Sequence, residues 1–212
     1  MLDKYARKLI DPPLTRAAQM LKKSGLSATQ VTVAGFGIGG LCCLALFYQL
    51  YGLALAFLLL NRLSDGLDGT LARLYDTDAT QPDKGTSDYG GYLDIVLDMV
   101  FYAGFVFFFC LGRPEFFAYG AFLIFSFMGS SASFLTYGIF TAKHGEITAE
   151  RGPKSFFHAA GVMEGTETIL FFVLFCVFPG LFAVLSIIFA GLCWVTTCGR
   201  IYKARQNFSG TS

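Results

Sequence analysis

Long apolar stretches separated by short polar or turn-forming breaks dominate this sequence of 212 residues. A helix needs about 20 predominantly apolar residues to cross a membrane, and six stretches approach or exceed that length. The breaks hold polar runs or turn-forming pairs such as Pro179-Gly180. The pattern therefore predicts an all-α fold, an integral membrane bundle of six transmembrane helices. We place the spans at residues 31–49, 52–73, 90–111, 116–140, 162–178 and 181–200.

The first 30 residues alternate basic and apolar side chains instead of forming an apolar run. This alternation favours an N-terminal amphipathic juxtamembrane helix that turns its basic side toward lipid headgroups. A solvated, charged tail is the alternative. The expected domain organisation is a cytoplasmic amphipathic juxtamembrane segment at 1–30, a six-helix transmembrane catalytic domain at 31–205 and a tail at 206–212.

The composition agrees with a membrane protein, because 54% of the residues are hydrophobic and only 15% are charged. Soluble domains have about 45–50% apolar and about 25% charged residues. The net charge of +1 gives no indication of nucleic-acid binding. All six cysteines lie in apolar stretches without the spacing of a zinc site, so we interpret them as small buried hydrophobic residues.

The basic residues predict the orientation. With six spans both termini lie on one side, and that side receives every lysine and arginine except Arg62 and Arg113. Because cytoplasmic segments are enriched in lysine and arginine, we expect both termini in the cytoplasm. The acidic residues other than Glu115 lie in the same segments or at the cytoplasmic ends of spans. Any chemistry is therefore expected at the cytoplasmic face of the membrane.

Four aspartates form the constellation most indicative of chemistry. Asp65 and Asp68 lie three positions apart near the end of the second span, and Asp94 and Asp98 lie four apart near the start of the third. Both spacings place two carboxylates on one face of a helix. The two helices are consecutive and joined on the cytoplasmic side, so we expect them to pack antiparallel and to bring the four carboxylates together.

Four carboxylates gathered near lipid repel one another and lose solvation. Protonation of some of them or binding of divalent cations would resolve this, and we favour cations. Mg²⁺ and Mn²⁺ prefer oxygen ligands, and two such ions balance four aspartates. A pair of ions about 3.5–4 Å apart is a known clamp for phosphoryl chemistry. Arg73, beside the carboxylates, could hold a phosphate or pair with the acidic cluster.

These residues resemble the signature of the CDP-alcohol phosphotransferase family. The second span holds two aspartates, a glycine, an alanine and an arginine, and the third holds a glycine and two aspartates, all in the family's order. The six-span layout and the amphipathic N-terminus are similar to the family as well, in particular to a poorly characterised bacterial inner-membrane branch. The eight matching residues are Asp65, Asp68, Gly69, Ala72, Arg73, Gly90, Asp94 and Asp98.

The resemblance implies an enzyme that moves a phosphatidyl group from a CDP-linked lipid, such as CDP-diacylglycerol, to a small alcohol acceptor and releases CMP. Asp65, Asp68 and Asp94 would bind one Mg²⁺ or Mn²⁺ ion, and Asp68, Asp94 and Asp98 would share a second. Asp98 would also be the general base. A homodimer in the lipid of a bacterial inner (plasma) membrane is implied too. The residues expected to contact the CDP and phosphate groups are Asp68, Gly69, Ala72, Arg73 and Gly90.

Two features depart from the family pattern. Residues 74–89 separate Arg73 from Gly90, and this polar loop is roughly twice as long as is usual in the family. The extra length could cover the site or alter nucleotide contacts. Many members also carry a Pro-Asn-x-x-Thr stretch before the first span, of which only Thr32 is present here.

The sequence leaves the acceptor open. Basic residues of the 141–158 loop and of the end of the sixth span could bind a phosphorylated acceptor, such as glycerol 3-phosphate or an inositol phosphate. The general excess of basic residues in cytoplasmic segments explains them equally well. The candidate acceptor-binding residues are Lys143, Arg151, Lys154 and Arg200.

A divalent-cation transporter and a non-catalytic member of the same fold are the competing hypotheses. A transporter would need polar groups toward the far face of the membrane, whereas the acidic groups gather on the cytoplasmic side. A non-catalytic protein would not need all eight signature residues.

Overall fold

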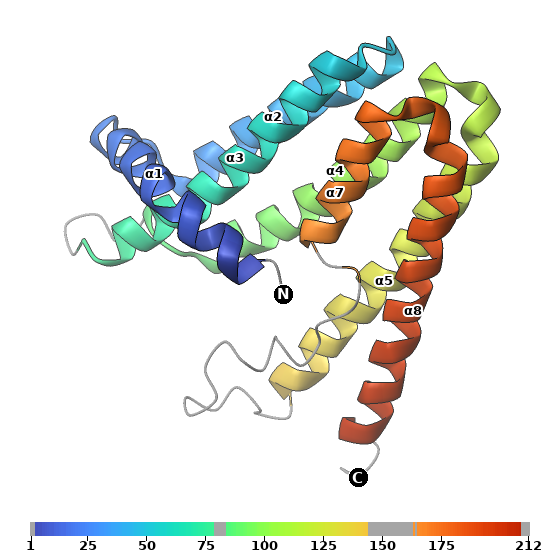
Figure 1. Ribbon diagram of the computed structural model, residues 1–212. Coiled ribbons are helices and arrows are strands. Elements are labelled where there is room, and N and C mark those ends of the chain that lie inside the picture. The colour runs from blue at the N-terminus through green and yellow to red at the C-terminus, as the bar shows by residue number, and fades with distance from the viewer. Residues whose placement is uncertain (1–2, 79–83, 144–162, 164, 209–212) are drawn as a thin grey trace. The chain divides into compact units, whose positions relative to one another are not determined.

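The computed structural model describes residues 3–78, 84–143, 163 and 165–208. The regular structure of these residues is helical, as the sequence predicts. Contacts divide the chain into two compact units, Met1–Arg113 and Pro114–Ser212. In chain order (Figure 1) the first unit contains α1 (Asp3–Lys23), α2 (Ala28–Phe47), α3 (Tyr51–Asp76) and α4 (Asp88–Gly112), and the second contains η2 (Pro114–Phe116), α5 (Phe117–Lys143), α7 (Gly165–Val177), η3 (Pro179–Leu181) and α8 (Phe182–Phe208).

Within the described ranges, four helical segments are long and apolar enough to cross a membrane. They are α2, α4, η2 with α5, and η3 with α8, and each coincides with a predicted span. The other two predicted spans coincide with α3, whose second half carries several charged residues, and with α7, which has 13 residues. An apolar, all-α membrane protein is therefore confirmed, whereas the count of six spans stays a prediction.

Capping residues set where the helices of the first unit begin. The Ser27 hydroxyl accepts a hydrogen bond from the Gln30 amide, and the Gln30 side chain accepts one from the Ser27 amide, a reciprocal capping box. Ser87 caps α4 with its hydroxyl alone, which accepts from the Gly90 amide at 3.0 Å. These caps fix the residues at which α2 and α4 begin.

Helix α2 packs against both α3 and α4. A Cβ atom on Gly35 would lie 2.8 Å from the Ser64 side chain, and one on Gly39 would lie 2.8 Å from the Phe101 ring. Because these glycines lack side chains, α2 approaches both neighbours closely. We expected α3 and α4 to pack directly on each other; instead α2 is the principal neighbour of each, and α3 reaches α4 through long side chains such as Arg62.

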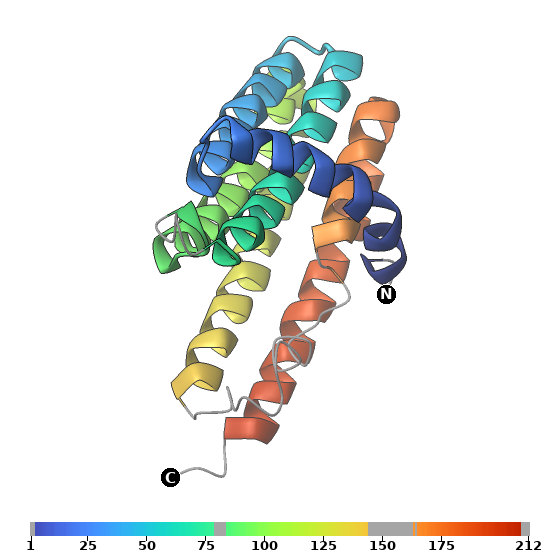
Figure 2. The ribbon, with the colours of Figure 1, turned by 90° about the vertical axis from the view of Figure 1, so that its left-hand side faces the viewer.

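Helix α1 lies across α3 (Figure 2). Leu14 and Ala18 are buried, and Ala18 packs in a cluster with Leu71 and Tyr75 of α3. Arg16 and Lys23 are exposed on the opposite side. This two-sided distribution agrees with the predicted amphipathic helix, and the apolar side is covered by α3.

The described residues on either side of 79–83 in the long polar loop contact the end of α3. The Lys84 ammonium donates to the Gly25 carbonyl at 2.9 Å and lies 5.9 Å from the Tyr75 ring centre. Asp76 accepts hydrogen bonds from the amide and the hydroxyl of Thr86. These two donors hold the pKa of the Asp76 carboxyl below its ordinary value. The described ends of the loop are therefore anchored to α3 and to the turn between α1 and α2.

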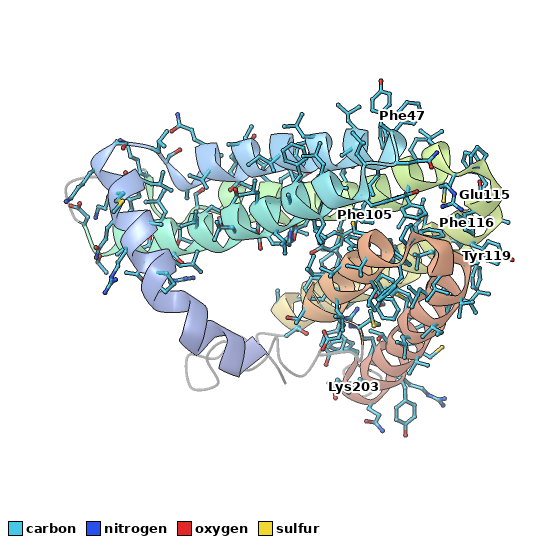
Figure 3. All side chains as sticks on the ribbon, turned by 45° about the horizontal axis from the view of Figure 1, so that its top comes forward. Phe47, Phe105, Glu115, Phe116, Tyr119 and Lys203 are labelled. Carbon is cyan, nitrogen blue, oxygen red and sulfur yellow. The ribbon has the colours of Figure 1, made fainter. Side chains whose placement is uncertain are left out.

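Aromatic side chains are found both in the core and on the surface. Phe105 of α4 is fully buried, whereas Phe47 projects outward from the end of α2 (Figure 3). In the second unit, the Phe171 and Phe189 rings stack with centroids 4.5 Å apart, and Phe175 and Phe182 lie 4.6 Å apart. These ring pairs join α7 to α8.

We expect Gly112→Ala to destabilise the protein, because its Cβ would lie 2.7 Å from the Leu46 and Phe47 carbonyl oxygens, which are backbone atoms. Overpacking of this kind costs about 1–3 kcal/mol, and each kcal/mol lowers the unfolding midpoint by about 2–4 °C in a chain of this size. Thermal unfolding in detergent measures this lowering of the midpoint. Gly104→Ala on the same helix is the control, because its Cβ would meet only the Cys43 sulfur at 3.6 Å. Equal midpoints for the two variants would contradict the proposed contact.

Candidate active site

The four aspartates of the sequence motif line one pocket in the first unit. Asp65 and Asp68 come from α3, and Asp94 and Asp98 come from α4. The predicted convergence is therefore confirmed, although their chemical roles are not thereby tested. The lining is completed by residues of α2 and by further residues of α3 and α4, so three helices build the pocket. Those residues are Thr32, Gly35, Phe36, Asn61, Arg62, Leu97 and Phe101.

Asp68 is the most buried of the four and is held by a residue of α2. The Thr32 hydroxyl lies 2.6 Å from Asp68 Oδ2 and donates a hydrogen bond to it. Only 7% of Asp68 is exposed. A short bond from a neutral donor to a carboxylate orients it without cancelling its charge. Thr32 therefore fixes which way Asp68 points.

Asp98 is held by Arg62 of α3. The guanidinium donates to Asp98 Oδ1 at 2.7 Å and to Asp98 Oδ2 at 3.3 Å. The Tyr102 hydroxyl, one turn further along α4, also donates to Asp98 Oδ2, at 3.2 Å. Both carboxylate oxygens of Asp98 thus have donors from side chains of the pocket wall.

Asp65 of α3 and Asp94 of α4 interact with each other. Arg62 approaches Asp65 as well, with 3.8 Å between Nη1 and Oδ2. Two carboxylates in direct contact repel each other unless a proton or a cation compensates them. The Arg62 charge is directed mainly at Asp98, so the contact between Asp65 and Asp94 is where compensation is most needed.

The donor chemistry of the pocket suits a hard divalent cation, because carboxylate oxygens are the ligands that Mg²⁺ and Mn²⁺ prefer. Even so, the described part of the chain contains no group of three acidic, histidine or cysteine side chains arranged to hold a metal ion. Arg62 engages Asp98 and Thr32 engages Asp68, so two of the four carboxylates have side-chain donors.

The predicted CDP- and phosphate-binding residues other than Asp68 lie outside the pocket lining. Arg73 is exposed near the end of α3 and donates to the Thr70 hydroxyl at 3.1 Å. Its Nη1 atom would lie 3.6 Å from a Cβ on Gly69, so the guanidinium folds back over that glycine. Gly90 lies in the first turn of α4, under the Ser87 cap. For these residues and for Ala72, the predicted roles stay predictions.

The predicted acceptor-binding residues belong to the second unit. Lys143 is exposed at the end of α5. Arg200 is buried in α8, where it donates to the Ser130 carbonyl at 3.0 Å and lies 5.3 Å from the Phe134 ring centre. Arg151 and Lys154 lie outside the described residues. An acceptor role for the four stays a prediction.

The sequence did not indicate the importance of Arg62 and Asn61. Asn61 is buried; its amide donates to the Gly35 carbonyl at 2.8 Å, and its oxygen accepts from Arg62. The available signal was an arginine inside an apolar span, because an ionisable residue in such a place normally faces a partner. Its position three residues before Asp65 puts it on the acidic face.

Comparisons with known proteins show what the chain is similar to. Residues 26–199 match the model of the CDP-alcohol phosphatidyltransferase family. The chain is 43% identical over 204 residues to the inner membrane protein YnjF of Escherichia coli K12, covering 96% of this chain and 95% of that protein. It is 28% identical over 207 residues to archaetidylinositol phosphate synthase of Pyrococcus horikoshii, covering 97% of each.

Solved structures share the fold. The phosphatidylinositol phosphate synthase PgsA1 of Mycobacterium tuberculosis, with CDP-DAG bound, matches with a TM-score of 0.66 at 18% identity, over 94% of this chain and 96% of that one. The same enzyme in complex with manganese and citrate matches with a TM-score of 0.66 at 17% identity, over 94% and 92%. At such identities the likeness concerns the fold.

We expect Thr32→Val to destabilise the first unit, because it keeps the branched shape and removes the donor to Asp68. Removing one partner of a buried hydrogen bond to a polar or charged group costs about 1–3 kcal/mol, which thermal unfolding in detergent would detect. Thr32→Ser retains the hydroxyl and should unfold close to the wild-type midpoint. If the serine and valine variants unfold at the same temperature, the hydrogen bond does not stabilise the fold.

Proposed function

Because the chain belongs to the CDP-alcohol phosphatidyltransferase family, we propose that it transfers a phosphatidyl group from CDP-diacylglycerol to a phosphorylated polyol and releases CMP. The family's chemistry is the transfer of a substituted phosphate group in membrane lipid synthesis. The observation that carries the proposal is the gathering of the four motif aspartates around one pocket. Four carboxylates on two helices are costly in an apolar protein and are retained where they serve a function.

Asp65, Asp68 and Asp94 would hold a divalent cation, and Asp68, Asp94 and Asp98 would share a second once Asp98 is released from Arg62. PgsA1, which shares the fold, has been solved in complex with manganese, which supports Mg²⁺ or Mn²⁺ as the cofactor here. When bound, the cation supplies positive charge beside the donor diphosphate and the departing CMP. The aspartates themselves orient and neutralise that cation, and Thr32 keeps Asp68 directed into the pocket.

Asp98 is our candidate for the general base that removes the proton from the acceptor hydroxyl. In the structure its two oxygens accept hydrogen bonds from Arg62 and Tyr102. To accept the proton at Oδ1 or Oδ2, Asp98 must first exchange at least one of these donors for the acceptor hydroxyl. Arg73, which is exposed next to Gly69, would turn from Thr70 to a phosphate of the donor.

A phosphorylated polyol is favoured as the acceptor for two reasons. Two relatives that share the family or the fold are named as inositol phosphate lipid synthases. In addition, the second unit carries the basic residues Lys143 at the end of α5 and Arg200 within α8. We propose that these two, together with Arg151 and Lys154, bind the acceptor phosphate.

We further propose a bacterial inner membrane location, six spans, and both termini and the active site on the cytoplasmic side. Lysine and arginine enrichment in the segments on that side supports the orientation. The relative YnjF is named an inner membrane protein. A homodimer is expected from the resemblance to the family.

Purified protein should release CMP from CDP-diacylglycerol when Mn²⁺ or Mg²⁺ and an acceptor are supplied. Asp98→Asn should lower the rate by about 10²–10⁴-fold, the range for loss of a general base. Asp88→Asn is the matched control, because Asp88 lies at the start of the same helix outside the pocket and should leave the rate unchanged. Full activity of Asp98→Asn would remove that residue from the base role. Absence of CMP release with every acceptor, from folded protein, would contradict the proposed function.

The acceptor proposal predicts that inositol 1-phosphate or glycerol 3-phosphate supports faster CMP release than inositol or glycerol. Arg200→Gln should raise KM for the phosphorylated acceptor and leave KM for CDP-diacylglycerol unchanged, because the acceptor phosphate loses its proposed partner. The thermal unfolding midpoint in detergent separates this effect from the loss of the bond to the Ser130 carbonyl. Arg205→Gln, an exposed arginine of the same helix, is the control. Preference for an unphosphorylated alcohol would overturn the acceptor assignment.

A further inference from the structure

Arg62 is positioned more firmly than a surface arginine would be. Its guanidinium donates to the Asn61 oxygen from Nε at 2.9 Å and from Nη2 at 2.6 Å, and to the Tyr102 hydroxyl from Nη1 at 3.1 Å. It also lies over the Phe101 and Tyr102 rings, 5.4 and 5.5 Å from their centres. Stacking on aromatic faces favours a guanidinium over an ammonium. The side chain is thus fixed by partners from α3 and α4.

Asn61 extends this arrangement to the third helix of the pocket. Its amide donates to the Gly35 carbonyl of α2 at 2.8 Å. The residue is 4% exposed, so its oxygen, turned toward Arg62, has little access to water. The guanidinium is therefore part of a polar network that joins α2, α3 and α4. Its bonds to Asn61 and Tyr102 hold it in place beside Asp98.

The position of Arg62 matters because it faces the same pocket as the four carboxylates. Four aspartates and one arginine leave three formal negative charges. A divalent ion on Asp65, Asp68 and Asp94 would leave one. Arg62 already spans both oxygens of Asp98, which are the atoms that a second ion would need as ligands.

We propose that Arg62 is a built-in counter-cation that occupies Asp98 in the nucleotide-free protein, so that the resting site takes one divalent ion instead of two. This inference rests on the proposed function only in assuming that the pocket binds a divalent ion. Arg62 is a positioning residue: it keeps Asp98 from acting as a ligand or base until a substrate disturbs the pair. The signature aspartates alone would suggest two equivalent ion positions, and Arg62 makes them unequal.

The test counts Mn²⁺ ions bound to the full chain in detergent without nucleotide, by titration with the electron paramagnetic resonance signal of free Mn²⁺. Wild type should bind one ion. Arg62→Met frees Asp98 and should bind two, a twofold change in stoichiometry. Arg62→Met combined with Asp98→Asn removes both charges and should bind one. Arg16→Met, which removes an exposed arginine of α1, is the control and should bind one.

Two ions bound to the wild type, or one ion bound to folded Arg62→Met, would overturn the inference. If Arg62→Met does not fold without metal, Mn²⁺ should restore it, because a second ion replaces the missing charge. Its unfolding midpoint should then rise more with Mn²⁺ than that of the wild type. Arg62→Met that stays unfolded in Mn²⁺, while the double variant folds, would likewise overturn it.

These outcomes are separable from those of the proposed function. Ion counting needs no turnover, so a wild type that binds two ions and still releases CMP would contradict only the role of Arg62. A wild type that binds no ion and releases no CMP would contradict the metal-dependent transferase itself.

Discussion

Four carboxylates gathered in one pocket of a largely apolar protein create a charge that the rest of the first unit must accommodate. Burial weakens solvation, and closeness adds repulsion. Arg62 donates hydrogen bonds to Asp98, and Thr32 donates one to Asp68, whereas Asp65 and Asp94 lie in the same pocket, where Arg62 comes only within 3.8 Å of Asp65. An arrangement that is only partly neutralised in this way favours the binding of a cation, and this property links the fold to phosphoryl chemistry.

The packing of α2 makes that arrangement possible. Gly35 and Gly39 let α2 approach both α3 and α4, so that Thr32 reaches Asp68 and the Gly35 carbonyl reaches Asn61. A helix with larger side chains at these two positions would hold α3 and α4 further away. The pocket thus depends on small residues that carry no chemistry, and on caps that fix the start of α2 and α4.

Much of this could be predicted from the sequence, because hydrophobic runs and carboxylate spacing are local patterns. The positions of four of the six predicted spans, the amphipathic α1 and the convergence of the aspartates follow from such patterns. What could not be predicted depends on contacts between distant residues: Arg62 with Asp98, Asn61 with Gly35, and α2 as the shared neighbour of α3 and α4. The sequence shows Arg62 only as a charge in an apolar span, and its partner is set by helix packing.

The central claim is that the pocket of α2, α3 and α4 binds the divalent ion needed for phosphatidyl transfer. Anomalous scattering at the manganese absorption edge, from crystals of the protein grown with Mn²⁺, tests this most directly because it locates the ion. We expect a peak among the carboxylates of Asp65, Asp68 and Asp94. A peak bound elsewhere on the chain, with none among these three, would contradict it.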